Sequence, residues 1–254
     1  MSTGQGGGVQ SVERAFRVLE IIAAAGGEMT LSDLSATVEL PLPTIHRLLR
    51  TMVTLGHVRQ MPSRSYALGP RLVPLGEAAN RQLGVASRPI LQRLADQLGE
   101  SANMATLDGP MIVYIGQVQS TRSMRMFTEV GRRALAHATG VGKAILATMS
   151  DADVERLVGR DIAQPTPRSA ATLGQLVERL EVVRAHGYSI DDEEQELGVR
   201  CYAMAVPGTP VRTGISVSGP SSRVDDAFGA RAVPLLRRAA QEIADGLGAV
   251  GAAG

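Results

Sequence analysis

Two short amphipathic segments joined by a tight turn are the feature that most restricts how this chain can fold. The first begins at the sequence TLSD (30–33), a capping-box pattern in which Thr30 caps a helix and Asp33 reaches back to the first amides of that helix. Pro41 lies in the turn after it, and the next helix starts near Pro43, where the missing N–H would have no helical partner. Gly56 ends that helix. Two helices connected so tightly are typical of a helix-turn-helix.

The segments on either side extend this prediction to a winged helix-turn-helix. A helix is predicted upstream because apolar residues repeat at helical spacing before Gly26 and Gly27 stop the pattern. These apolar residues are Val12, Ala15, Phe16, Leu19, Ile22 and Ala23. Downstream, residues 57–61 and 65–68 flank Pro62-Ser63-Arg64 and predict a short hairpin, the wing.

Charge within this region favours DNA as the partner. The whole chain has a net charge of only +1, so a polyanion must be met by a local patch. No Asp or Glu occurs from Leu40 to Gly76, and the third helix fits a major groove. The candidate DNA contacts are Thr44, His46, Arg47, Arg50 and Thr51 on that helix and Arg59 and Arg64 on the wing. A three-helix protein-interaction module is the alternative.

Strands alternate with helices in the second half and predict an α+β domain with a largely antiparallel sheet. Strands are expected at 103–107, 111–119, 124–128, 200–206 and 213–218, and helices at 142–148, 151–158, 173–186 and 224–247. The mostly helical stretch before them, residues 72–98, is expected to break near Pro74 to Gly76 and again at 84–89. We expect a DNA-binding domain at 9–70, a linker helix at 71–84 and a ligand-sensing domain at 85–250.

The late strands predict a compact pocket. Alternation puts Cys201 on one strand face with small neighbours, and Ser216 and Ser218 share one face of the next strand. Gly140 and Val141 open a helix whose free amides favour a carboxylate, and Asp191 ends a strand. A buried apolar cysteine, solvent-facing serines and a simple tight turn are the alternative interpretations.

Several classes of protein are excluded by composition. The only cysteine, Cys201, rules out a disulfide framework and a cysteine-based zinc site, and the four histidines lack metal-ligand spacing. No apolar run approaches the ~20 residues of a membrane span, and the Gly-rich start lacks the regions of a signal peptide. We therefore expect a cytoplasmic protein with no metal, no cofactor and no membrane partner.

At this point the residues resemble the IclR family of bacterial transcription regulators. The likeness covers nearly the whole chain from Val9 to Leu247. Its blocks, in family order, are LPLPTIHRLLRT (40–51), LGHV (55–58), YALG (66–69), GRR (131–133), HATGVGKA (137–144), GYSIDDEE (187–194), GVRC (198–201) and ISVSGP (215–220).

This resemblance implies a GAF-like effector-binding fold and, as partner, a small organic acid. It matches Gly140, Val141, Asp191, Cys201, Ser216 and Ser218 to positions where relatives hold such acids. It also makes a dimer of dimers plausible, beyond the homodimer that one small domain needs to read a pseudo-palindromic operator.

We therefore expect a ligand-responsive, one-component transcription regulator and not an enzyme. Two other functions stay open from the residues alone. One is a small-molecule-binding protein whose first domain contacts other proteins. The other is a hydrolase in which Cys201, His137 and Asp191 act as nucleophile, base and orienting group.

Overall fold

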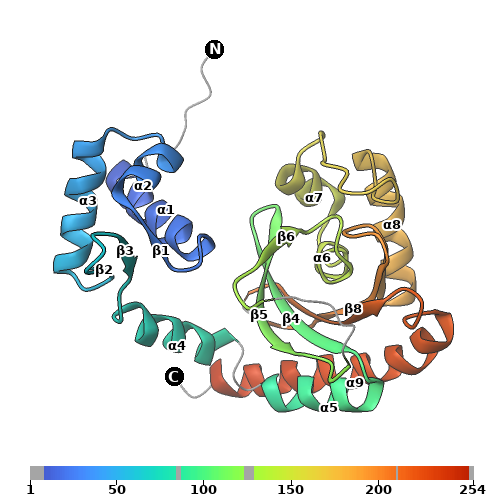
Figure 1. Ribbon diagram of the computed structural model, residues 1–254. Helices are drawn as coiled ribbons and strands as arrows, with labels where there is room; N and C mark the ends of the chain where they lie inside the picture. Colours follow the sequence, from blue (N-terminus) through green and yellow to red (C-terminus); the bar gives the residue numbers. More distant parts are fainter. Residues whose placement is uncertain (1–8, 84–86, 123–128, 210, 252–254) are drawn as a thin grey trace. The chain divides into compact units, whose positions relative to one another are not determined.

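The computed structural model describes residues 9–83, 87–122, 129–209 and 211–251 of the 254 (Figure 1). By its internal contacts the chain divides into two compact units, 1–79 and 80–254. The division falls within helix α4 (Leu72–Leu83). In the described parts of the chain, no helix has the length and apolar character that a membrane span needs.

The first unit contains the predicted helix-turn-helix and wing. Its helices are α1 (Gln10–Ala24), α2 (Leu31–Val38) and α3 (Leu42–Thr54). Its sheet has the order β1-β3-β2, with β1 at Glu28–Met29, β2 at Val58–Gln60 and β3 at Tyr66–Leu68. The hydroxyl of Thr30 accepts a hydrogen bond from the Asp33 amide at 3.2 Å and donates one to the Asp33 carboxylate at 2.7 Å, so Thr30 caps α2 as predicted.

Two features of this unit differ from the sequence prediction. Strand β1 is an addition, since it pairs with β3 across a large gap in the sequence. The predicted apolar face of α1 is wrong for Val12 and Phe16, which are 51% and 61% exposed, whereas Val18 and Ile22 are fully buried. The apolar stripe is wider than the surface that α2 and α3 offer, so only one side of it enters the core.

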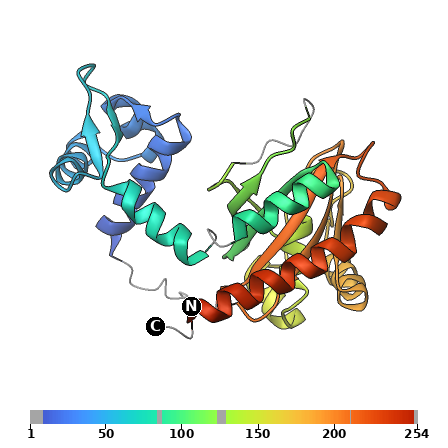
Figure 2. The same ribbon diagram turned by 90° about the horizontal axis from the view of Figure 1, so that it is seen from below.

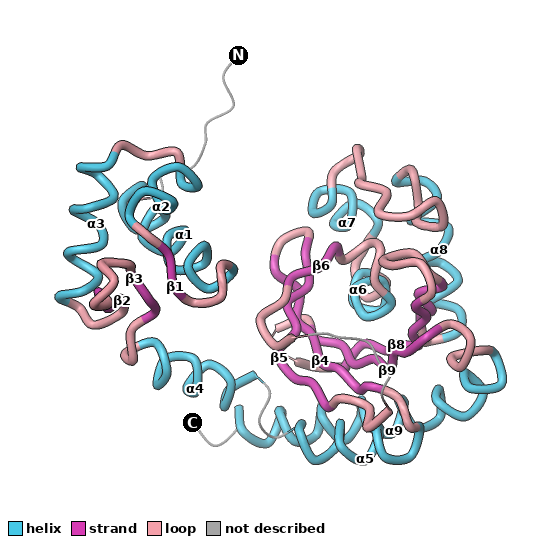
Figure 3. The backbone as a smooth tube through the Cα atoms, in the orientation of Figure 1, coloured by secondary structure: helices cyan, strands magenta, loops and turns pink. Residues whose placement is uncertain are grey.

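The second unit is built on one six-stranded antiparallel sheet of order β6-β5-β4-β9-β8-β7. Its strands are β4 (Ser101–Asp108), β5 (Met111–Val118), β6 (Arg133–Leu135), β7 (Ser189–Asp192), β8 (Val199–Val206) and β9 (Thr213–Pro220). Its helices are α5 (Arg88–Leu98), α6 (Gly140–Leu146), α7 (Asp151–Val158), α8 (Leu173–His186) and α9 (Asp226–Gly251). The sheet curls around α6 (Figure 3).

Each face of this sheet has its own core, as the alternation predicts. Helices α5 and α9 lie along one face (Figure 2), where they pack on Tyr202, Met204 and Val217. Helix α6 lies on the other face and packs on Cys201 and Ala203, with α7 and α8 beyond it. The small side chains of this second face leave space between the sheet and α6.

Some predicted boundaries need correction. Helix α4 continues through Pro74, because a proline in the first turn breaks no helical hydrogen bond. Helix α6 begins at Gly140, two residues earlier than predicted. Strand β6 is an addition, and the strand expected at 124–128 lies outside the described residues.

Candidate functional site

The outer surface of α3 carries the predicted DNA contacts. Ile45, Leu49 and Met52 face the core, and this fixes the rotation of the helix. His46, Arg47, Arg50 and Thr51 are exposed, Thr44 is half-buried, and Arg59 and Arg64 are exposed on the wing. The Thr51 hydroxyl already donates to the Arg47 carbonyl at 3.0 Å, so of these two residues it is the Arg47 side chain that stays free to reach outwards.

The wing is not free of acids, although residues 40–76 are. Strand β1 brings Glu28 beside the hairpin, where its carboxylate accepts hydrogen bonds from Ser65 and, at 3.1 Å, from Ser63. These hydrogen bonds lower the pKa of Glu28, so the carboxylate is charged. The acid-free surface expected from the sequence is therefore confined to α3 and part of the wing.

A cavity of about 30 Å³ in the second unit brings together all six predicted effector residues. That volume is about the share of one water molecule in the liquid. The lining residues are Tyr114, Thr139, Gly140, Val141, Asp191, Gln195, Glu196, Val199, Cys201, Ser216 and Ser218. Ser216 and Ser218 are only 2% and 5% exposed, which excludes solvent-facing serines.

Strand register sets the geometry of the cavity floor. Ser218 pairs with Cys201, and Cys201 pairs with Asp191, so the three residues form one row across β9, β8 and β7. With neighbouring strands ~4.8 Å apart, Ser218 and Asp191 lie roughly 10 Å from each other on either side of the thiol.

Gly140 forms the opposite wall. A Cβ atom at this position would lie 2.5 Å from the sulfur of Cys201, closer than any side chain tolerates. The glycine therefore allows α6 to begin directly over β8. The hydroxyl of Thr139 caps the helix by accepting a hydrogen bond from the Gly142 amide at 3.1 Å. The first two residues of the helix, Gly140 and Val141, line the cavity.

Asn103 on β4 is a neighbour of the cavity that the sequence did not reveal. Its side chain is 2% exposed and its Nδ2 donates to the Ser218 Oγ at 3.0 Å. A hydroxyl that accepts in this way keeps its own O–H as a donor. Ser218 can therefore donate a hydrogen bond into the cavity.

Asp191 is buried and holds the end of β7. Its Oδ1 accepts from the amides of Glu194 at 2.8 Å and Gln195 at 3.3 Å. Burial raises the pKa of Asp191 to about 7, against the opposing effects of Lys143 and of the two backbone hydrogen bonds. The carboxyl is consequently half-protonated near neutral pH.

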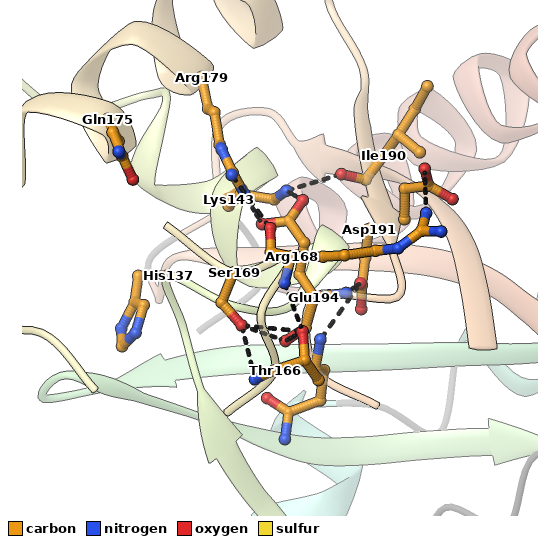
Figure 4. A network of polar contacts seen from close by, with 12 residues as sticks. His137, Lys143, Thr166, Arg168, Ser169, Gln175, Arg179, Ile190, Asp191 and Glu194 are labelled. Carbon is orange, nitrogen blue, oxygen red and sulfur yellow. Dashed lines mark hydrogen bonds and ion pairs between the residues drawn. The ribbon is translucent and has the colours of Figure 1, made fainter. Parts of the chain in front are cut away.

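A buried ionic network anchors the loop after β7 (Figure 4). Lys143 pairs with Glu194 and donates to the Ile190 carbonyl at 2.7 Å. The other oxygen of Glu194 binds Arg179 at 2.5 Å.

The main chain of the same loop is also held by two hydroxyl groups. The Ser169 hydroxyl donates to the Glu194 carbonyl at 2.5 Å, and the Thr166 hydroxyl donates to the Glu193 carbonyl at 2.7 Å. Two residues of the acidic run, Asp191 and Glu194, are thus internal to the fold.

The arrangement does not support a cysteine hydrolase. Burial and the negative charge of Asp191 raise the pKa of Cys201, which disfavours the thiolate that a nucleophile needs. The Nε2 of His137 is hydrogen-bonded to the Ala163 carbonyl at 2.7 Å, so this nitrogen is engaged away from the thiol. Cys201 is instead a small buried wall residue of the cavity.

A helix-turn-helix unit followed by a separate α+β unit with a small cavity lined by hydroxyl, thiol and carboxyl groups is typical of one class of protein, the one-chain transcription regulators with a ligand-binding domain. Residues 11–62 match the IclR helix-turn-helix domain, and residues 77–245 match the bacterial transcriptional regulator IclR C-terminal domain. The chain belongs to the IclR family of bacterial transcriptional regulators.

Named relatives agree with a regulator and not an enzyme. The transcriptional repressor IclR of Escherichia coli is 37% identical, over 95% of this chain and 90% of its own length. The regulator BhcR of Paracoccus denitrificans is 33% identical, over 95% of this chain and 88% of its own. The crystal structure of an IclR regulator from Alicyclobacillus acidocaldarius superimposes with a TM-score of 0.84 at 26% identity, covering 94% of this chain and 99% of its own.

Proposed function

We propose that this regulator senses a small organic monoacid in the cavity between α6 and the sheet and adjusts its binding to a pseudo-palindromic operator accordingly. The observation that carries the proposal is that one small cavity is lined by all six residues, Gly140, Val141, Asp191, Cys201, Ser216 and Ser218.

The carboxylate of the acid lies between the start of α6 and strand β9. The amides of Gly140 and Val141 donate to it, the first by giving up its hydrogen bond to the Cys201 sulfur, and so do the hydroxyls of Ser216 and Ser218. The hydrogen bond from Asn103 to Ser218 supports this role, because it leaves the Ser218 proton available. A helix start contributes only about 0.3–1 kcal/mol when exposed and up to ~2 kcal/mol when partly buried. Affinity is therefore expected to be micromolar or weaker.

The remaining walls restrict the ligand. Asp191 repels a second carboxylate once it is charged, so a monoacid is preferred to a diacid. The cavity is narrow, at about 30 Å³, and this restricts the ligand to a short acid.

Operator binding is assigned to the outer surface of α3 and to the wing, in a dimer. One such unit covers too few base pairs for useful specificity, and a pseudo-palindromic site matches two copies. The exposed apolar side chains of Val12 and Phe16 on α1 support association of two copies. Sedimentation is expected to give a dimer or a dimer of dimers at micromolar concentration, and a monomer both free and on DNA would contradict this.

Regulation requires that the acid binds two arrangements of the dimer with different affinity. Helix α4, between the two units, is proposed to transmit the difference to the spacing of the DNA-reading units.

The test has two parts. Genomic fragments that the full-length protein enriches are first used to define the operator, and candidate acids are then screened for their effect on that complex. Calorimetric titration of an active acid follows, with wild type and with the Ser216→Ala, Ser218→Ala double variant. Equal affinity in both proteins would show that this cavity is not the sensor. Failure to enrich any DNA would favour a first unit that contacts proteins.

A further inference from the structure

Gln195 presents an unused hydrogen-bond acceptor at the effector cavity. It lines the cavity from the loop between β7 and β8. Its Oε1 is fully buried and has no hydrogen-bond partner within the described parts of the chain. Buried side-chain oxygens are nearly always paired, so an orphan at a ligand cavity indicates a partner that the protein itself does not supply.

The position of Gln195 is fixed by its neighbours. The backbone N–H of Gln195 donates a hydrogen bond to the Asp191 Oδ1 at 3.3 Å. The preceding residue, Glu194, is tied down through its carboxylate by Lys143 and Arg179 and through its carbonyl by Ser169. The loop therefore holds the backbone of Gln195 next to the cavity, and its acceptor does not depend on ligand binding to be brought there.

A second orphan acceptor lies on the same side of the sheet. The Oδ1 of Asn103 is buried without a partner among the described residues, while the Nδ2 of the same amide binds Ser218. Register places Asn103 opposite Ser216, so its side chain belongs to the layer that holds the cavity. One neutral acceptor, that of Gln195, is thus at the cavity itself, and a second, that of Asn103, lies behind its wall beside Ser218.

This surplus of acceptors distinguishes among small acids. A carboxylate and a ketone only accept hydrogen bonds, and neither can satisfy an amide oxygen. A hydroxyl group donates one. From this we infer, on the basis of the proposed acid site, that the effector is a short 2-hydroxy acid and that Gln195 is the residue that selects its hydroxyl over a 2-keto or unsubstituted carbon.

Three acids of nearly equal size test the inference with the full-length protein: 2-hydroxypropanoate, 2-oxopropanoate and propanoate. Calorimetry with wild type is expected to show the hydroxy acid binding about tenfold more tightly than the other two, as one added hydrogen bond predicts. Gln195→Met keeps the length of the side chain and removes its acceptor. It should abolish this preference and leave the affinities for the other two acids within about twofold.

Leu197→Ala is the matched control, since Leu197 lies on the same loop, is 60% exposed and is not part of the cavity lining. It should retain the preference for the hydroxy acid. Thermal unfolding of each variant verifies that the loop substitutions leave the fold intact.

The outcomes separate this inference from the acid site itself. Equal binding of the three acids by wild type, or an unchanged preference in Gln195→Met, would overturn the role of Gln195 while leaving the acid site in place. Tighter binding of alanine, which carries an ammonium donor, than of the hydroxy acid would overturn the assignment of a hydroxy acid as the effector. If none of the acids binds at millimolar concentration, the acid site fails, and the role of Gln195 fails with it.

Discussion

Lys143 and Glu194 form an ion pair with side chains that are only 3% and 7% exposed, one on α6 and the other on the loop after β7. Because Glu194 also binds Arg179 of α8, a single carboxylate joins two helices to a loop that lines the cavity. The pair lies close enough to Asp191 for Lys143 to lower, and Glu194 to raise, the pKa of that carboxyl.

Removal of this carboxylate is expected to destabilise the protein strongly. Glu194→Ala leaves Lys143 buried without its counter-charge, and breaking a buried pair in this way costs about 3–5 kcal/mol. Urea unfolding should show a loss of that order. Glu181→Ala, an exposed carboxylate on the same helix as Arg179, should stay within about 0.5 kcal/mol of wild type. Similar small losses in both variants would contradict the anchoring role.

Arg47→Ala is expected to weaken operator binding by about 1–3 kcal/mol if the guanidinium reads a guanine. If the guanidinium binds a phosphate instead, the operator and an unrelated duplex should lose similar binding free energy. Titration of an operator fragment and of an unrelated duplex at several salt concentrations distinguishes the two cases. Arg156→Ala, on α7 of the second unit, is the control and should not change the affinity. Unchanged operator affinity for both Arg47→Ala and Arg50→Ala in folded protein would contradict the assignment of α3.

Asp191 should make stability depend on pH. Its folded pKa of about 7 lies above the ordinary value of 3.8, because burial disfavours the charged form. Below about pH 4 the group is protonated in both folded and unfolded states and has no effect. Between about pH 4 and pH 7 the carboxyl is charged in the unfolded state and still protonated in the folded state. The free energy of unfolding therefore falls by up to about 1.4 kcal/mol per pH unit in this range and is constant above about pH 7.

Asp191→Asn removes this titration and keeps an oxygen that can accept from Glu194 and Gln195. Relative to wild type, the variant should therefore gain stability as the pH rises from 4 to 7, by an amount on the order of a few kcal/mol. Denaturant unfolding at pH 5 and pH 8 measures the difference. A constant difference between the two proteins at both pH values would show that Asp191 is not the titrating group.

Gly140→Ala should both destabilise the second unit and close the cavity, because the added Cβ meets the Cys201 sulfur at 2.5 Å. Overpacking of this kind costs about 1–3 kcal/mol. Gly174→Ala, in the first turn of α8, places the new methyl group in ordinary contact with the Thr172 hydroxyl at 3.9 Å and should instead raise stability by up to about 1 kcal/mol. Addition of Cys201→Ala to the Gly140 variant should recover part of the loss, and no recovery would place the clash elsewhere.

Strand alternation in the sequence indicated three residues of the cavity wall, and the family resemblance decided between the pocket and the alternative interpretations. Ser216, Ser218 and Cys201 follow from strand alternation, which depends only on neighbours in sequence. Tyr114 does not, because a bulge opposite Met104 and Ala105 adds Ile115 to β5. The extra residue reverses which side chains of β5 point to which face of the sheet. Tyr114 therefore faces α6, and Ile115 packs in the core between the sheet and helices α5 and α9.

Long-range pairing accounts for the other misses. Asn103 reaches Ser218 only because β4 pairs with β9, a contact between residues 115 positions apart. Glu28 reaches Ser63 on the wing through β1, which is two residues long and carries no strand pattern. Neither partner leaves a signal in the sequence around the other.

The bare backbone wall at Gly140 has a consequence for how such a sensor can change over time. One wall of the part of the cavity assigned to the carboxylate is main chain at Gly140, where a side chain would meet the Cys201 sulfur at 2.5 Å. The other walls include the side chains of Tyr114, Gln195 and Val199, which belong to two strands and a loop rather than to α6. New ligand preferences can therefore arise by substituting those side chains one at a time, while the contacts to the carboxylate of the ligand stay the same.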